Sequence, residues 1–383
     1  MIIYLAWFFA SVILCMLTLR YGRRTQMVAM SLFMIALGAF VGLGDMLGGY
    51  DRYIYAELFD SIANSNRMGD NPWTTDAFAF YGTEFGYGTW EALLSYITAN
   101  RYIYILITTM TIYILLIISL RQYVDNAPFA VVIFMGLWFF FTFTYLRQVM
   151  ACTVCWFAVK YIIERKFVPF LIVWFIGYSL HNSAIIFLPA YFIPIRKFPI
   201  KWVIWVMVGA MLLGLTPFPQ ALFDAYGDVN EERIGAGQYA MDAGFRWAYL
   251  IEAVFFLFVI LTNYKQIALQ KKNIVMLNMA LVFCALLLVF VRSENGGRLG
   301  WLFMIGVMCT MSNICIDLKN KRMLTNGALM MVVAFFLFFR ILTGWSFQLY
   351  PYKTFLTNGF REGDLVHETF EYDPSYDVDK FYR

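Results

Sequence analysis

The sequence predicts an all-α fold, a polytopic transmembrane helical bundle, and three observations carry that prediction. Of the 383 residues, 61% are hydrophobic and only 14% are charged, whereas ordinary soluble domains carry about 25% charged residues. Several apolar stretches run for roughly 17–20 residues, the length with which a helix crosses about 30 Å of hydrocarbon. These stretches are continuous and lack the short alternating segments that are typical of a membrane β-barrel.

We expect about twelve spans, and the apolar runs place them at residues 2–19, 27–44, 101–119, 128–145, 148–163, 167–181, 183–195, 201–216, 246–263, 274–291, 299–316 and 323–342. The first run has no basic residue ahead of it and no small-residue cleavage site, so we interpret it as a retained span. The sixth and seventh runs are short enough for one of them to be a broken or re-entrant helix, which is tolerated where protein or water satisfies the backbone.

Basic residues predict the orientation, because loops rich in lysine and arginine stay in the cytoplasm. When the loop with Arg20, Arg23 and Arg24 is taken as cytoplasmic and the spans alternate, the short connections on that side hold 16 of the 29 basic residues. Only three of the 25 acidic residues fall on the same side. Both termini and all long connections are then expected outside.

Three longer segments are expected on the outer side, at 45–100, 217–245 and the tail 343–383, while residues 1–342 otherwise form the bundle. Long loops in compact folds are usually functional or disordered. In the first segment, apolar and aromatic residues recur at helical spacing, which predicts a helix along the membrane surface: Tyr50, Tyr53, Ile54, Leu58 and Ile62. A second amphipathic stretch at 85–97 leads into the third span.

Four arginines are exceptions to the rule that basic residues gather on the cytoplasmic side. Ionisable residues at membrane depth tend to be functional. These four stand at the outer ends of predicted spans: Arg147, Arg246, Arg292 and Arg298. A guanidinium is a permanent, planar, bidentate donor that suits phosphate, so we expect Arg147, Arg292 and Arg298 to converge on an anion. The alternative is that these arginines reach lipid headgroups or pair with Glu252 and Glu294.

His181 lies at the outer junction of two short predicted spans. An imidazole titrates near neutral pH and can act as a general base; alternatively, His181 ties two helix ends together by hydrogen bonds. Cys152 and Cys155 form a CxxC pair, but they fall within a predicted helix with no second pair or histidine cluster for a metal. We therefore expect packing there, and neither a metal nor another cofactor.

Short motifs spread along most of the chain resemble those of the EpsG-type proteins among the Wzy-like polysaccharide polymerases. In order they are Gly49–Tyr53, Leu58–Phe59, Glu84–Tyr87, Leu146–Gln148, His181–Ala184, Arg298 and Tyr350–Tyr352. The Arg147–Gln148 pair and the His181-x-Ser183 element, each opening a predicted span, are the most specific parts. The tail beyond Phe360 has no matching counterpart.

The resemblance implies an enzyme that joins oligosaccharide repeat units carried on undecaprenyl diphosphate into a surface polysaccharide (O-antigen, capsule or exopolysaccharide). It implies work at the outer face of a bacterial inner (cytoplasmic) membrane. It also implies a fold resembling the lipid-dependent, GT-C-like glycosyltransferases, which need no nucleotide sugar, and a metal-independent reaction. The expected partners are the lipid-linked glycan donor and acceptor, the lipid bilayer and a chain-length regulator protein, but no nucleic acid.

Such a transfer needs a cation for the diphosphate leaving group and an acceptor for the hydroxyl proton. We predict Arg147 and Arg298 for the first role, and His181 or Glu84 for the second, ahead of Asp51 and Glu294. Substrate contacts are expected from further polar residues of the outer side: Asp51, Gln148, Arg246, Arg292, Glu294 and Tyr352. Two other functions fit the pattern, a transporter or flippase for a lipid-linked glycan and a membrane acyltransferase that modifies surface glycans.

Overall fold

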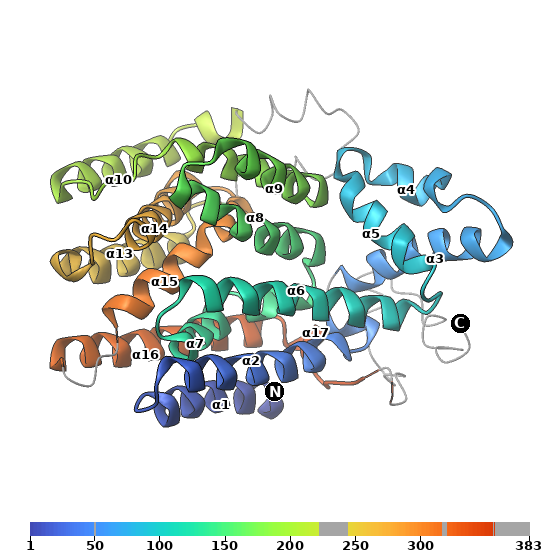
Figure 1. Ribbon diagram of the computed structural model, residues 1–383, viewed down its shortest axis with the longest axis horizontal. Coiled ribbons are helices and arrows are strands. Elements are labelled where there is room, and N and C mark those ends of the chain that lie inside the picture. Colours follow the sequence, from blue (N-terminus) through green and yellow to red (C-terminus); the bar gives the residue numbers. More distant parts are fainter. Residues whose placement is uncertain (50, 222–243, 316–319, 355, 357–383) are drawn as a thin grey trace. The chain divides into compact units, whose positions relative to one another are not determined.

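The computed structural model describes residues 1–49, 51–221, 244–315, 320–354 and 356, and the regular elements of these residues are helices (Figure 1). An isolated antiparallel bridge pairs Gly44 with Thr354. The predicted all-α class is therefore confirmed. The chain forms two compact units: the described residues of 1–154, 175–182 and 327 onward make the first, and those of 155–174 and 183–326 make the second.

The first unit contains a bundle of apolar helices in which α1, α2 and α6 run side by side (Figure 1). Its members are α1 (Ile2–Thr18), α2 (Arg23–Gly42), α6 (Arg101–Tyr123), α7 (Ala127–Leu137), the start of α8 (Leu146–Glu164) and most of α16 (Lys321–Gly344). A Cβ on Gly38 or Gly42 of α2 would lie 2.8 Å from Tyr113 or Leu106 of α6. These two glycines therefore let the helices approach closely.

The predicted outer segment 45–100 folds into a group of short helices between α2 and α6. They are η1 (Met46–Gly48), α3 (Arg52–Met68), η2 (Pro72–Thr74), α4 (Asp76–Phe80), η3 (Gly82–Glu84) and α5 (Phe85–Ser95), where η marks a 3-10 helix. The two helices predicted in this segment are thus present, although Tyr50 lies outside the described residues. α3 packs on α5 and α6, and the buried Asp60 Oδ2 lies 2.5 Å from Nη2 of Arg101 on α6.

The described start of the predicted tail packs against the first unit. α17 (Ser346–Leu349) contacts η1, and the Tyr4 hydroxyl of α1 donates to the Leu349 carbonyl at 2.7 Å. The Tyr352 ring stacks on Phe40 with 4.2 Å between centroids, and its hydroxyl donates to the Phe40 carbonyl at 2.7 Å. Residues 357–383 of the tail and 222–243 of the second outer segment lie outside the described residues.

The second unit is organised around α14 (Lys271–Val289), which packs against α10, α13, α15 and η7. Its elements besides α14 are the end of α8, the start of α9 (Phe167–Leu180), most of η5 (Asn182–Phe192), α10 (Ile200–Gly214), α13 (Trp247–Thr262), η6 (Tyr264–Gln266), η7 (Gly296–Phe303) and α15 (Met304–Ile314). A Cβ on Gly306 of α15 would lie 2.7 Å from the backbone of α14. Glycine at this position therefore permits the close packing of the two helices.

Each of the twelve predicted spans coincides with one helix or with two consecutive helices. Among the described residues, five helices are long and apolar enough to cross a membrane: α2, α6, α8, α14 and α16. In two of the other predicted spans the α-helix is short because a 3-10 helix takes up the rest of the apolar run: η4 (Phe139–Phe143) follows α7, and η7 precedes α15. The predicted seventh span is the 3-10 helix η5, in which Pro189 lacks the amide hydrogen of a regular helix. The number of spans and the position of the termini stay predictions.

Candidate active site

Glu84, Arg147 and His181, three of the four predicted catalytic residues, come together in the first unit. Glu84 ends η3, Arg147 is the second residue of α8, and His181 lies between α9 and η5. Arg147 Nη1 lies 2.6 Å from Glu84 Oε2. The backbone N–H of Asn182 donates to Glu84 Oε1 at 2.9 Å, and His181 Nδ1 lies 3.9 Å from the same oxygen.

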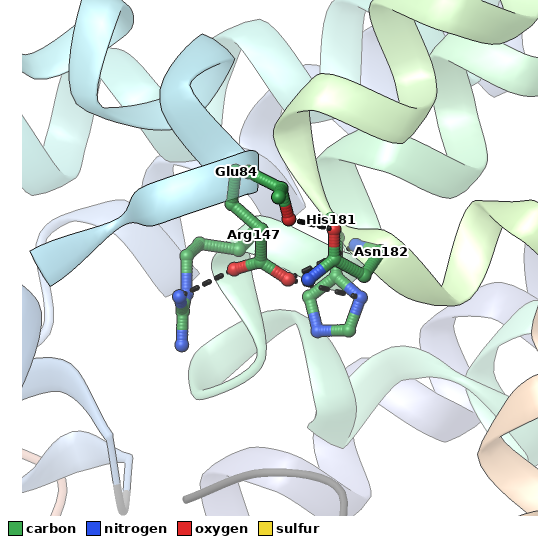
Figure 2. Close-up of polar contacts among 5 residues, drawn as sticks. Glu84, Arg147, His181 and Asn182 are labelled. Atoms are coloured by element: carbon green, nitrogen blue, oxygen red, sulfur yellow. Dashed lines mark hydrogen bonds and ion pairs between the residues drawn. The ribbon is translucent and has the colours of Figure 1, made fainter. Parts of the chain in front are cut away.

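The Glu84 carboxylate is the centre of this arrangement, with Arg147 on one side and His181 and Asn182 on the other (Figure 2). Burying a carboxylate is costly unless it is paired and hydrogen-bonded, and the guanidinium and the backbone amide together meet that need. The exposed fraction of the side chain is 11% for Glu84, 14% for His181 and 24% for Arg147. Arg147 is therefore the group of the three that a ligand reaches most easily.

A glycine-bounded turn brings Glu84 to this position. Gly82 adopts a φ of 52°, in the left-handed region that favours glycine. Gly86 lies so close to α9 that a Cβ would be 2.9 Å from the backbone carbonyl carbon of Ser179. The Thr83 hydroxyl donates to Asn182 Oδ1 at 2.7 Å. The turn between the two glycines is thus fastened to the junction that carries His181.

Arg147 is supported by aromatic rings from the 45–100 segment. Its Cζ lies 5.4 Å from the centroid of the Tyr55 ring and 5.6 Å from that of Tyr81. A guanidinium over an aromatic face is attracted by the negative electrostatic potential of that face, which arises from the ring quadrupole, and the attraction is stronger away from water. The rings and Glu84 therefore fix the direction in which Arg147 presents its donors.

Glu91 is a functional candidate that the sequence interpretation missed. It is fully buried within α5, and its Oε1 accepts a hydrogen bond from the Tyr104 hydroxyl at 2.6 Å. Burial raises the pKa of Glu91 to about 8, although the hydroxyls of Tyr104 and Tyr81 and the charge of Arg147 act to lower it. A lone acid among the apolar residues of the 85–97 stretch was the signal that could have identified it.

Arg246, Arg292, Glu294 and Arg298 belong to the second unit. Arg246 Nη2 lies 3.7 Å from Glu294 Oε1 and donates to the Glu294 carbonyl at 3.2 Å. Arg246 therefore pairs with Glu294, which the sequence offered as the alternative to anion binding. The Arg298 Cζ lies 5.6 Å from the Trp301 ring centroid, and Arg292 is exposed. The predicted roles of these residues stay predictions.

The other predicted substrate contacts have different surroundings in the first unit. The Asp51 backbone N–H donates to the Thr144 hydroxyl at 2.8 Å, directly before α3 begins. Gln148 follows Arg147 in α8, but its side chain is buried. Tyr352 is half-buried, and its stacking on Phe40 gives it an evident packing role. The substrate contacts predicted for these three residues stay predictions.

Within the described residues, no three side chains of His, Cys, Asp or Glu gather in a way that could hold a metal ion. The six cysteines are buried, including Cys152 and Cys155 of the CxxC pair. A thiol surrounded by apolar neighbours is usually an inert packing residue. The groups that the candidate site offers for chemistry are a guanidinium, a carboxylate and an imidazole.

A sequence model described as the EpsG family matches residues 27–354. The chain belongs to the EpsG family. The matched region covers most of the chain, and it includes every predicted site residue of this EpsG-family protein, from Asp51 to Tyr352. The resemblance to EpsG-type polysaccharide polymerases is thereby confirmed. No curated protein and no solved structure matches the chain.

Proposed function

We propose that this EpsG-family protein is a metal-independent polysaccharide polymerase. It transfers a growing glycan from undecaprenyl diphosphate to a sugar hydroxyl of the next lipid-linked repeat unit. The observation that supports this most is the joining of Arg147, Glu84 and His181 in one largely buried site. A glycosyl transfer from a diphosphate requires a cation for the leaving group and a group that accepts a proton.

In the proposed reaction, the oxygen of the acceptor hydroxyl forms a bond to the anomeric carbon of the donor glycan. The bond between that carbon and the diphosphate oxygen breaks, and its electron pair leaves with the diphosphate. Arg147 stabilises the charge that develops there, because a guanidinium can donate two parallel hydrogen bonds to phosphate oxygens. The hydroxyl proton passes to a base of the protein.

His181 is the proposed base, and Glu84 orients it. Glu84 already accepts hydrogen bonds from Arg147 and from the Asn182 N–H, which makes its carboxylate a weaker proton acceptor. His181 Nδ1 lies 3.9 Å from Glu84 Oε1, and such contacts often tighten when substrate binds. A carboxylate beside Nδ1 favours the tautomer with its hydrogen there, which leaves Nε2 to accept the proton.

We place the reaction at the outer face of a bacterial inner membrane. This part of the proposal rests on the charge distribution, because basic residues gather in the short connections on one side and the longer acidic segments lie on the other. Glu84, His181 and the start of α8 fall on the acidic side. Arg298 is kept as a second diphosphate ligand on the basis of its sequence position alone.

Deletion of the gene in its bacterium, followed by analysis of the lipid-linked intermediates, tests the proposal. A polymerase deletion should accumulate single lipid-linked repeats that an impermeant reagent can reach from outside. Repeats trapped on the cytoplasmic side would instead indicate a flippase. Polymer of normal length without its acyl groups would indicate an acyltransferase. Complementation by the wild-type gene but not by its Arg147→Lys variant links the result to the site.

A further inference from the structure

A buried tyrosine–glutamate cluster lies behind Arg147, and the proposed reaction leaves it without a role. We define the cluster as Tyr55, Tyr81, Tyr87, Glu91 and Tyr104, all of which belong to the first unit. The side chains come from α3, the turn before η3, α5 and α6. Tyr87, Glu91 and Tyr104 have no exposed surface. So much buried polar surface is costly unless its groups are satisfied.

The contacts run inward from Arg147 through aromatic rings. Tyr55 and Tyr81 both lie against the guanidinium. The same two rings contact Tyr87, with 5.8 Å between the centroids of Tyr55 and Tyr87 and 5.6 Å between those of Tyr81 and Tyr87. The Tyr87 ring therefore contacts both of the rings that lie against Arg147. A shift of Tyr87 would move these two rings and, with them, the guanidinium.

Hydrogen bonds anchor Tyr87 to Glu91. The Tyr87 and Tyr104 hydroxyl oxygens are 2.8 Å apart, and Tyr104 donates to Glu91 Oε1 at 2.6 Å. A phenol carries a single hydrogen, so Tyr104, which gives its hydrogen to Glu91, must accept from Tyr87. The Tyr104 ring is itself fixed by stacking on Phe59 at 4.3 Å. Glu91 is thus the final acceptor in the series of hydrogen bonds from Tyr87 through Tyr104.

The protonation state of Glu91 follows from its surroundings. The groups that face it are the hydroxyls of Tyr104 on α6, Tyr81 and Tyr87, and the charge of Arg147 on α8. Burial outweighs them and raises the pKa of Glu91 to about 8, so the carboxyl is mostly neutral at pH 7. Oε2 and the Tyr81 hydroxyl are both buried, and Tyr81 acts on the pKa of Glu91 as a hydrogen-bonding side chain. A hydrogen on Oε2 would have the Tyr81 oxygen as its nearby acceptor.

We propose that Glu91, in its protonated form, is a positioning residue for Arg147, acting through Tyr104, Tyr87 and the rings of Tyr55 and Tyr81. The inference rests on the proposed function, because it takes Arg147 as the group that binds diphosphate. An ionised Glu91 would place a second negative charge near Arg147 and compete with Glu84 for the guanidinium. Deprotonation of Glu91 therefore weakens the active arrangement of Arg147.

The test compares Glu91→Gln and Glu91→Ala with wild type and with Glu57→Gln, which changes an exposed glutamate of α3. The full-length proteins in lipid nanodiscs polymerise lipid-linked repeats from about pH 6 to about pH 9. Glutamine mimics the neutral carboxyl, so Glu91→Gln should stay within about twofold of wild type at pH 7 and lack the wild-type fall in rate above about pH 8. Glu91→Ala should be slower by about tenfold or more, as expected for a misplaced catalytic group.

The same fall in rate above pH 8 in Glu91→Gln and wild type would overturn the inference, and so would a wild-type rate in Glu91→Ala. A second readout does not depend on catalysis. Phenylglyoxal labelling of Arg147, followed by peptide mass spectrometry, should be several-fold faster in Glu91→Ala than in Glu91→Gln or wild type. Equal labelling in all three proteins contradicts the positioning role. A wild-type protein that forms no polymer counts against the proposed function, and the labelling then still decides the role of Glu91.

Discussion

Arg147 Nη1 lies 2.6 Å from Glu84 Oε2, and this contact joins the start of α8 to a turn of the outer segment 63 residues earlier in the chain. The same carboxylate accepts the Asn182 N–H, so three separate parts of the chain meet at one side chain. A loss of Glu84 would therefore leave both a guanidinium and a backbone amide without their anion.

Arg147→Lys should reduce polymer formation by roughly 10–1000-fold, the usual scale for loss of a donor to a developing charge. Lysine keeps the charge but cannot donate two parallel hydrogen bonds from a planar group. The initial rate with purified lipid-linked repeats is the measurement, and Arg67→Lys at an exposed position of α3 is the matched control. We expect the same loss in Arg298→Lys. Near-normal rates in properly inserted variants would mean that these arginines only contact lipid headgroups.

His181→Gln should remove most turnover while KM changes little, because glutamine keeps hydrogen bonding but cannot accept the proton. Steady-state kinetics with purified lipid-linked repeats check this expectation. If His181→Gln works at close to the normal rate while Glu84→Gln is inactive, then Glu84 is the base and His181 only positions substrate.

Gly86→Ala should impair activity without changing any polar group of the site. The new Cβ would lie 2.9 Å from the backbone carbonyl carbon of Ser179, so the turn that carries Glu84 has to move away from α9. The hydrogen bond from Asn182 to Glu84 would then lengthen or break. The control is Gly209→Ala on α10, where no atom lies within 4 Å of the added Cβ. Equal turnover in the two variants would show that the turn tolerates this movement.

The stability of the folded protein should fall as pH rises from about 4.5 to about 8 because of Glu91. Its pKa is near 8 when folded and near 4.5 when exposed, so the folded state holds one more proton throughout this window. Stability then decreases with pH, by at most about 1.4 kcal/mol per pH unit for one group. The measurement is the apparent Tm in detergent as a function of pH. Its decrease with rising pH should be smaller in Glu91→Gln than in wild type and unchanged in Glu57→Gln. An unchanged slope in Glu91→Gln would mean that Glu91 does not hold the proton.

Single cysteines at Met68 and Leu269 test the orientation. Met68 is 79% exposed and Leu269 is 73% exposed, so a difference in labelling reports the side of the membrane and not burial. An impermeant thiol reagent applied to intact spheroplasts should modify Met68→Cys but not Leu269→Cys. The native cysteines are buried and should give little background. The reverse pattern would place the candidate site on the cytoplasmic side.

Local sequence patterns are enough to predict where the helices lie and which residue types are available for the chemistry. Long apolar runs specify helices locally, since in a low-polarity setting the backbone has to satisfy its own hydrogen bonds. That is why the twelve predicted spans coincide with helices from α1 to α16. Arg147, Glu84 and His181 could be selected because charged or titratable groups are rare beside such runs.

Which of these residues meet depends on tertiary packing, which no local pattern encodes. Glu84 and Arg147 are 63 positions apart, and nothing local in either motif specifies their contact. Their pairing depends on the packing of Gly86 against α9 and of α3 against α5 and α6. The role of Glu91 is also a tertiary property, because an acid is held neutral only when surrounding side chains remove it from water. Burial and proximity arise from contacts distant in sequence, so a local pattern could predict the helices but not the site that they assemble.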